Sequence, residues 1–268
     1  MTDRLEQVID EVNEGPVQMK HYVVFLLDRS TSMKSIREEA LDCINHQVEQ
    51  TKSGLEGQDH IKTEVSLVTF SSKVDQPELW CRPLQEIDPI PLEDYEPFGM
   101  TAMYDAVGYV IQRLQQQPDI NDKNTSVLMF IMSDGVENNS KNFGASHISA
   151  MVREMQATGR WTFVYEGANQ DLAEVQDATN INAGNTIRWT ADAAGLRQMT
   201  ITKDVASQQY YDHLVNASNT GGGAVASTGF YTGTAGSSDG IQDSHSGELR
   251  GTSFKWDSER QTDSKRLK

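Results

Sequence analysis

The sequence predicts an α/β fold with a mostly parallel central sheet and helices on both of its faces. Residues 23–27 and 126–132 are apolar almost throughout. Strands without polar alternation are buried on both faces, as the strands of parallel sheets are. Segments with apolar residues at helical spacing alternate with the strands, which is the pattern of repeated βα units.

The expected elements follow one another along most of the chain. The first strand covers about residues 21–27, and a helix follows Ser32 and ends near residue 53. The segment 74–84 carries two prolines, which suit an antiparallel edge strand. Residues 85–99 form a long proline-containing loop, a feature typical of functional or disordered segments. Further strands are expected at 63–70, 126–132, 161–166 and 186–189, and helices at about 103–117, 145–158, 172–178 and 190–214, the last with a break.

Composition divides the chain into three parts. Residues 1–17 contain an amphipathic segment that predicts a helix packed on the domain, and residues 18–215 form the domain itself. Residues 216–268 hold nine of the twenty glycines and few aliphatic residues, which predicts a flexible tail. The alternative is a tail that docks on a partner protein through its aromatic residues, namely Phe230, Tyr231, Phe254 and Trp256.

Charge and cysteine content limit the classes of partner. The net charge of −16 disfavours nucleic acid and anionic lipid as partners, because like charges repel. The two cysteines, Cys43 and Cys81, form neither a zinc motif nor a disulfide framework. No apolar run approaches the length of a membrane span, and the first residues contain no apolar core of a signal peptide. We therefore expect a cytoplasmic protein.

Oxygen-bearing side chains follow two of the buried strands. Asp28, Ser30 and Ser32 follow the first, and Asp134 follows the strand 126–132, while Thr101 ends the long loop. Because the carboxyl ends of parallel strands share one edge of a sheet, these five side chains can converge. Oxygen ligands without histidine or cysteine favour a hard cation such as Mg²⁺ over zinc or copper.

Each residue of this group also has an ordinary structural explanation. Asp28 can cap the helix that follows it, because aspartate and serine are favourable N-caps. Asp134 and Gly135 can form a simple turn. The five residues in order along the chain favour a site over these separate explanations.

The same residues resemble those of the von Willebrand factor type A (VWA) domain. Residues 28–32 resemble its DxSxS motif, Thr101 its separate threonine, and Asp134 its second aspartate, and residues 166–171 are similar to stand-alone bacterial and phage members. The resemblance covers about residues 18–210 and implies a Rossmann-like fold with an intact metal-ion-dependent adhesion site (MIDAS) for Mg²⁺ or Mn²⁺. It implies that Ser30 and Ser32 ligate directly, that Thr101 does so in the ligand-bound form, and that both aspartates act mostly through water or at longer range.

The resemblance also implies a binding module and not an enzyme. The metal would capture an exposed Asp or Glu of a partner protein, and the chain would act as an adaptor or assembly factor. One alternative is a structural or assembly component whose tail docks the partner. A weaker alternative is a metal-dependent hydrolase or phosphotransferase, although the chain has no GxxxxGK[ST] phosphate loop.

Overall fold

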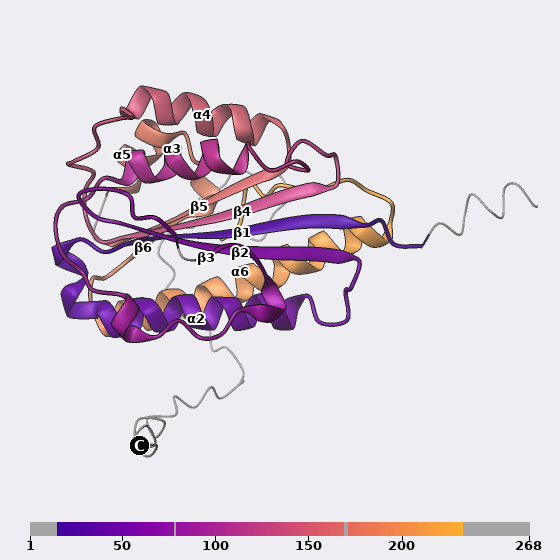
Figure 1. The fold of residues 1–268 in the computed structure, drawn as a ribbon, viewed down its shortest axis with the longest axis horizontal. Helices are drawn as coiled ribbons and strands as arrows, with labels where there is room; N and C mark the ends of the chain where they lie inside the picture. The colour runs from indigo at the N-terminus through magenta and orange to yellow at the C-terminus, as the bar shows by residue number, and fades with distance from the viewer. Residues whose placement is uncertain (1–14, 78, 169–170, 233–268) are drawn as a thin grey trace, which may run out of the picture. The chain divides into compact units, whose positions relative to one another are not determined.

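A computed structural model describes residues 15–77, 79–168 and 171–232, and it confirms the predicted α/β class (Figure 1). Six strands form one sheet in the order β3-β2-β1-β4-β5-β6. All neighbours are parallel except β3, which runs antiparallel to β2 at one edge, as predicted. The strands are β1 (Met19–Asp28), β2 (Ile61–Phe70), β3 (Leu79–Pro83), β4 (Thr125–Ser133), β5 (Trp161–Ala168) and β6 (Thr186–Trp189).

Helices cover both faces of the sheet (Figure 1). One face packs against α2 (Arg37–Gly54) and α6 (Ala193–Asn219), and the other packs against α3 (Met103–Leu114), α4 (Ala145–Ala157) and α5 (Leu172–Thr179). Short 3-10 helices are η1 (Thr31–Ile36), η2 (Leu84–Glu86), η3 (Leu92–Asp94) and η4 (Ala183–Asn185). The helix expected after Ser32 therefore begins as a 3-10 turn.

The continuous apolar run of β1 is explained by these two layers. Val23, Phe25 and Leu27 join the core beneath α2 and α6, whereas Val24 and Leu26 join the core beneath α3 and α4. Successive side chains of a strand point to opposite faces, so both sets must be apolar. Burying each such side chain contributes roughly 1.5–3 kcal/mol to folding.

The described fold continues past the boundary predicted at residue 215. Helix α6 runs without the predicted break to Asn219, and the following residues pack on the domain as far as Thr232. The amide of Ala226 donates to the carbonyl of Gly159 (2.9 Å), and that of Phe230 to Oδ1 of Asn185 (2.8 Å). The glycine-rich composition hid these contacts, because they are made by backbone groups. The helix predicted within 1–17 lies mostly outside the described residues, which begin at residue 15.

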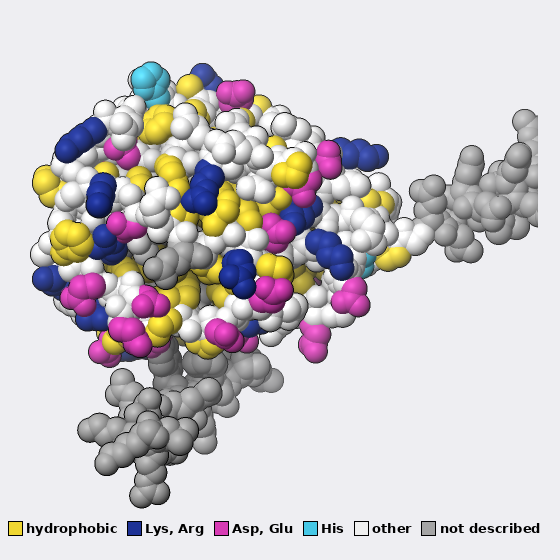
Figure 2. All heavy atoms as spheres, in the orientation of Figure 1, with side chains coloured by type: hydrophobic (Ala, Val, Ile, Leu, Met, Phe, Trp, Pro, Cys, Tyr) yellow, Lys and Arg dark blue, Asp and Glu magenta, His cyan; other side chains and the backbone are white. Residues whose placement is uncertain are grey.

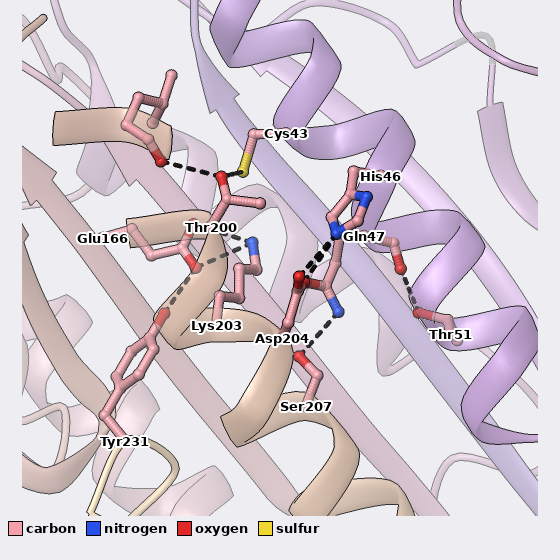
Figure 3. Close-up of polar contacts among 11 residues, drawn as sticks. Cys43, His46, Gln47, Thr51, Glu166, Thr200, Lys203, Asp204, Ser207 and Tyr231 are labelled. Carbon is pink, nitrogen blue, oxygen red and sulfur yellow. Dashed lines mark hydrogen bonds and ion pairs between the residues drawn. The ribbon is translucent and has the colours of Figure 1, made fainter. Parts of the chain in front are cut away.

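A polar seam joins α2 to α6 (Figure 3). Gln47 Nε2 donates to Ser207 Oγ (2.9 Å), and His46 Nε2 lies 2.9 Å from Asp204. Lys203 lies fully buried beneath α6, where its Nζ lies 2.9 Å from Glu166 Oε1. Three polar residues of α6, namely Lys203, Asp204 and Ser207, thus each have a partner, and α6 continues through them without the predicted break.

Candidate metal centre

The site is built at the ends of two neighbouring strands. β1 and β4 are parallel, and their pairing places Leu27 beside Met132. The next residues, Asp28 and Ser133, therefore lie side by side, and Ser133 Oγ donates to Asp28 Oδ2 (2.6 Å). This pairing brings together parts of the chain more than a hundred residues apart.

Asp28 is buried and does not cap a helix. Its Oδ1 accepts a hydrogen bond from the amide of Ser30 (2.7 Å), within the loop itself. The following helices η1 and α2 have no side-chain cap. The buried carboxylate therefore contacts the loop and β4, and the capping explanation does not account for it.

The two serines connect Asp28 to Asp134. Ser30 Oγ lies 3.0 Å from Ser32 Oγ, and Ser32 Oγ donates to Asp134 Oδ1 (2.6 Å). Four of the five predicted side chains therefore form one hydrogen-bonded group.

Thr101 reaches the same group through Gly135. A Cβ atom built on Gly135 would lie 3.0 Å from Thr101 Oγ1, 3.8 Å from Ser32 Oγ and 3.9 Å from Asp28 Oδ2. All five predicted residues thus converge around one point, and a side chain at Gly135 would crowd the threonine oxygen. Gly135 is accordingly more than a turn residue.

The electrostatics of this group are unbalanced. Burial raises the pKa of Asp28 to about 6, against the effect of its hydrogen bonds from Ser133 and Ser30, and burial also raises the pKa of Asp134. Neither carboxylate takes part in any ion pair among the residues that the structure describes. A divalent cation would supply the missing positive charge.

The donor set fits a hard cation. It consists of two carboxylates and three hydroxyls, all oxygen, which suits Mg²⁺ or Mn²⁺. Within the described ranges, no group of three or more His, Cys, Asp or Glu side chains could hold a metal. A metal centre at the strand edge would therefore depend on the hydroxyl groups.

Two acidic residues outside the predicted set hold the loop after Asp134. Asp105 accepts hydrogen bonds from the amides of Lys141 (2.9 Å), Asn142 (2.8 Å) and Phe143 (2.9 Å). Glu137 accepts from the amides of Asn139 (2.9 Å) and Ser140 (2.7 Å). The sequence indicated the role of Asp105 only through its proximity to Thr101. It gave no indication that Glu137 holds this loop.

Two further residues support Asp28 and were not predicted as part of the site. Tyr95 Oη donates to the backbone carbonyl of Asp28 (2.6 Å), and Ser133 donates to its carboxylate. Ser133 adjoins Asp134, so the strand end pointed toward it. Tyr95 comes from the long loop, whose path the sequence does not determine.

The aromatic residues predicted as partner anchors separate into two pairs. Phe230 is buried within 5.5 Å of Phe130 between ring centroids, and Tyr231 Oη donates to Glu166 Oε1 (2.7 Å). Both therefore pack within their own domain. Phe254 and Trp256 lie outside the described residues.

The fold and the oxygen-lined strand edge define an α/β domain of the kind that binds ligands at its strand ends. Residues 23–200 match the family model described as the von Willebrand factor type A domain. The chain therefore belongs to the VWA family. Domains of this family generally mediate protein interactions without catalysis, and they often bind a divalent metal.

Several solved structures resemble the chain at low sequence identity. Proximal thread matrix protein 1 from the mussel byssus is 15% identical, with a TM-score of 0.46, over 76% of this chain and 50% of that chain. This chain thus spans about half of the mussel protein's length. The vWF domain of the type V pili tip protein Mfa5 from Porphyromonas gingivalis is 10% identical, with a TM-score of 0.48, over 70% and 96%.

A third structure is the conserved hypothetical protein BatB from Bacteroides thetaiotaomicron. It is 13% identical, with a TM-score of 0.43, over 70% of this chain and 98% of that chain. No curated protein matches the sequence. The family assignment therefore depends on the match to the VWA family model.

Proposed function

We propose that this VWA domain is a divalent-cation-dependent protein-binding module with an intact MIDAS. Asp28, Ser30, Ser32, Thr101 and Asp134 hold Mg²⁺ or Mn²⁺, and the metal captures an exposed Asp or Glu of a partner protein. The observation that carries the proposal is the convergence of two carboxylates and three hydroxyls without an ion-pair partner among the described residues.

The residue types explain why such a centre would bind and not catalyse. A metal held largely by neutral hydroxyls keeps much of its positive charge and attracts an outside carboxylate. Asp28 is fixed by Ser133 and the Ser30 amide, so it is already positioned before binding. The role is that of an adaptor or assembly factor.

The proposal extends to the setting of the protein. Both cysteines are free, with Cys43 buried, which supports a reducing cytoplasmic environment. None of the helices in the described part of the chain is long and apolar enough to cross a membrane.

The alternative of tail docking now depends on fewer residues. Because Phe230 and Tyr231 pack within the domain, only Phe254 and Trp256 could serve as anchors. Deleting residues 233–268 separates the two ideas. Partner capture that survives this deletion and needs Mg²⁺ supports the MIDAS proposal.

Thermal unfolding with EDTA and then with millimolar Mg²⁺ or Mn²⁺ tests the metal first. We expect the wild type to melt higher with metal, and Asp28→Ala to show no response, because a ligand of the folded state stabilises it by mass action. Ser35→Ala, at an exposed serine of η1, is the matched control and should respond like the wild type.

Partner capture by pull-down is the second measurement. Ser30→Ala combined with Ser32→Ala should abolish metal-dependent capture, whereas Ser35→Ala should retain it. Capture that is unchanged in the double variant would show that the MIDAS is not the binding site.

A further inference from the structure

Large apolar side chains stand exposed on the two loops that carry Thr101 and Asp134. The exposed fractions are 51% for Phe98, 48% for Met100 and 68% for Val136. Across the described residues, the other large hydrophobic side chains of comparable exposure are Ile201, Val205 and Val225, which lie outside these loops. Half of the exposed large apolar residues in the described ranges thus lie within three positions of a proposed metal ligand.

The loop that carries Phe98 and Met100 is fixed against the first strand end. The amide of Phe98 donates to the carbonyl of Arg29 (2.7 Å), and the amide of Met100 donates to Ser72 Oγ (2.9 Å). The Arg29 guanidinium lies 4.5 Å from the centre of the Phe98 ring and is itself held by Asp75. Phe98 is therefore held in place by its neighbours while about half of it faces solvent.

Val136 is tied to the same region from the other side. The amides of Asn138 and Asn139 both donate to the carbonyl of Thr101, at 3.0 and 3.1 Å. A Cβ atom built on Gly135, next to Val136, would lie 3.0 Å from Thr101 Oγ1. The two loops therefore meet at Thr101, which follows Met100 in one loop and is bonded to the loop that contains Val136.

We propose that Phe98, Met100 and Val136 form an apolar collar that determines which carboxylate-bearing partner the centre accepts. The inference depends on the proposed metal-dependent function and adds the class of partner. The occupant is an extended segment of another protein whose Asp or Glu is flanked on both sides by large apolar side chains. Apolar contact with the collar supplies selectivity that a carboxylate alone lacks.

The negative charge of this chain predicts which residues should flank the apolar part of the partner segment. The loop that leads to Phe98 presents exposed Glu93 and Asp94. Acidic and basic residues balance over 233–268, so residues 1–232 carry the whole net charge of −16. A segment with lysine or arginine beyond its apolar residues would complement this surface and associate faster.

Three synthetic 12-residue peptides with lysines near both ends test the collar. One has a central Leu-Asp-Leu, the second a central Ser-Asp-Ser, and the third a central Leu-Asn-Leu. Fluorescence anisotropy measures their binding to the full chain with Mg²⁺ and with EDTA. We expect the first to bind at least about tenfold more tightly than the second, because its apolar neighbours lose water on binding, and the third not to bind.

Two variants replace exposed apolar residues by serine, one in the collar and one, as a control, on α6. Phe98→Ser, Met100→Ser and Val136→Ser combined should remove the tenfold preference for leucine flanks and keep the melting response to Mg²⁺. Ile201→Ser combined with Val205→Ser, on α6, should leave both unchanged. Thermal unfolding of each variant confirms that it folds.

The outcomes separate the two proposals. Equal Mg²⁺-dependent binding of both aspartate peptides would overturn the collar and leave the proposed function standing. If neither aspartate peptide binds while the wild type keeps its melting response to Mg²⁺, the collar is overturned and the proposed metal centre stands. Loss of the melting response as well overturns both. Sedimentation of the chain with Mg²⁺ tests the remaining occupant: a dimer lost in the collar variant would identify a second copy of this chain and overturn the partner segment.

Discussion

Two buried acidic side chains, on the strands that flank β4 on either side, are balanced in different ways. Glu166 on β5 is fully buried, and it meets Lys203 Nζ at 2.9 Å and Tyr231 Oη at 2.7 Å (Figure 3). Lys203 Nζ also lies 4.0 Å from the centre of the Phe130 ring. Asp28 on β1 is equally buried, yet among the described residues its carboxylate accepts hydrogen bonds from a hydroxyl and an amide and not from a cation.

The difference shows how the fold uses buried charge. The Glu166 cluster contains its own cation and is complete within the chain, so its role is structural. The Asp28 cluster lacks a cation among the described residues, and Asp134 adds a second negative charge. A buried carboxylate that is left unbalanced is costly, and such a cost is typical of functional sites. Figure 2 shows acidic and basic side chains mixed over one face of the molecule, where solvent screens them.

The largest effect should come from breaking the balanced cluster. Lys203→Met leaves Glu166 buried without a cation, and we expect the free energy of unfolding to fall by about 3–5 kcal/mol in urea titrations. Arg82→Met removes the exposed pair with Glu86 and should cost less than about 1 kcal/mol. A loss of similar size in both variants would contradict the role assigned to Lys203.

Adding Glu166→Gln to Lys203→Met should recover part of the lost stability. The double variant no longer buries an unpaired charge, so its unfolding free energy should lie above that of Lys203→Met. If the double variant is the less stable of the two, the penalty does not come from the orphaned carboxylate.

For the cluster of Asp28 and Asp134, the free energy of unfolding should change when metal binds and should change little when one carboxylate is removed without metal. With EDTA, we expect Asp134→Asn to unfold within about 1 kcal/mol of the wild type, because it removes an uncompensated charge. With Mg²⁺ at a hundred times its dissociation constant, the wild type should gain about 2.7 kcal/mol and the variant none. Asp94→Asn, at an exposed loop position, is the control, and a full metal response in Asp134→Asn would count against the centre.

Tyr231 tests how much the final contact contributes to the balanced cluster. Tyr231→Phe removes one hydrogen bond to the Glu166 carboxylate, and we expect a loss of about 1.5 kcal/mol in urea titrations. In a Glu166→Gln background the same change should cost less, because the acceptor is then neutral. An equal cost in both backgrounds would mean that the phenol contributes through packing alone.

His21 shows a third response to burial, since it stays neutral. Burial lowers the pKa of His21 from 6.5 to about 3, against the opposite effect of a backbone hydrogen bond at Ser126. Below pH 6.5 the His21 imidazole binds a proton in the unfolded chain but stays neutral in the folded chain. The stability is therefore complete above pH 6.5 and is lost as the pH falls, by up to about 1.4 kcal/mol per pH unit.

Urea unfolding at pH 7 and pH 5.5 measures this smallest effect. The wild type should lose about 1 kcal/mol more over this interval than His21→Asn does. His147→Asn, at an exposed histidine, should lose as much as the wild type. Identical losses in His21→Asn and the wild type would assign the acid sensitivity to other groups.

The sequence predicted the sheet well because its signals are local. The apolar runs of β1 and β4 and the prolines near β3 were sufficient to predict two buried strands and an antiparallel edge. Residues 216–232 were assigned to the tail, but α6 continues to Asn219, and the residues after it pack on the domain through backbone amides, such as that of Ala226, and through the side chains of Phe230 and Tyr231. A glycine-rich composition does not report such backbone contacts. The predicted break in the last helix was wrong, because α6 is continuous and its buried Lys203 pairs with Glu166, a partner far away in the sequence.

The five candidate ligands could be predicted because each follows a recognisable strand or loop end. The structure brings all five together, while their metal and partner stay predictions. The supporting residues Tyr95 and Glu137 could not be predicted, because the role of Tyr95 depends on how the loop 85–99 folds back on the sheet and that of Glu137 on the path of the loop after β4. Exposure of Phe98 likewise depends on the path of the loop 85–99.

The position of Tyr231 has a consequence for the order in which the domain matures during synthesis. Glu166 and Lys203 are translated well before Tyr231, which follows Lys203 by 28 residues. At a synthesis rate of about 5–20 residues per second, Tyr231 is added a few seconds after Lys203. The hydrogen bond from the Tyr231 phenol to Glu166 therefore forms after both members of the ion pair have been synthesised. The amide of Val17 also waits for the carbonyl of Ser218, to which it donates at 3.0 Å. A nascent chain paused near residue 215 would contain the residues of all six strands but would lack both the Tyr231 contact with Glu166 and the Ser218 contact with Val17.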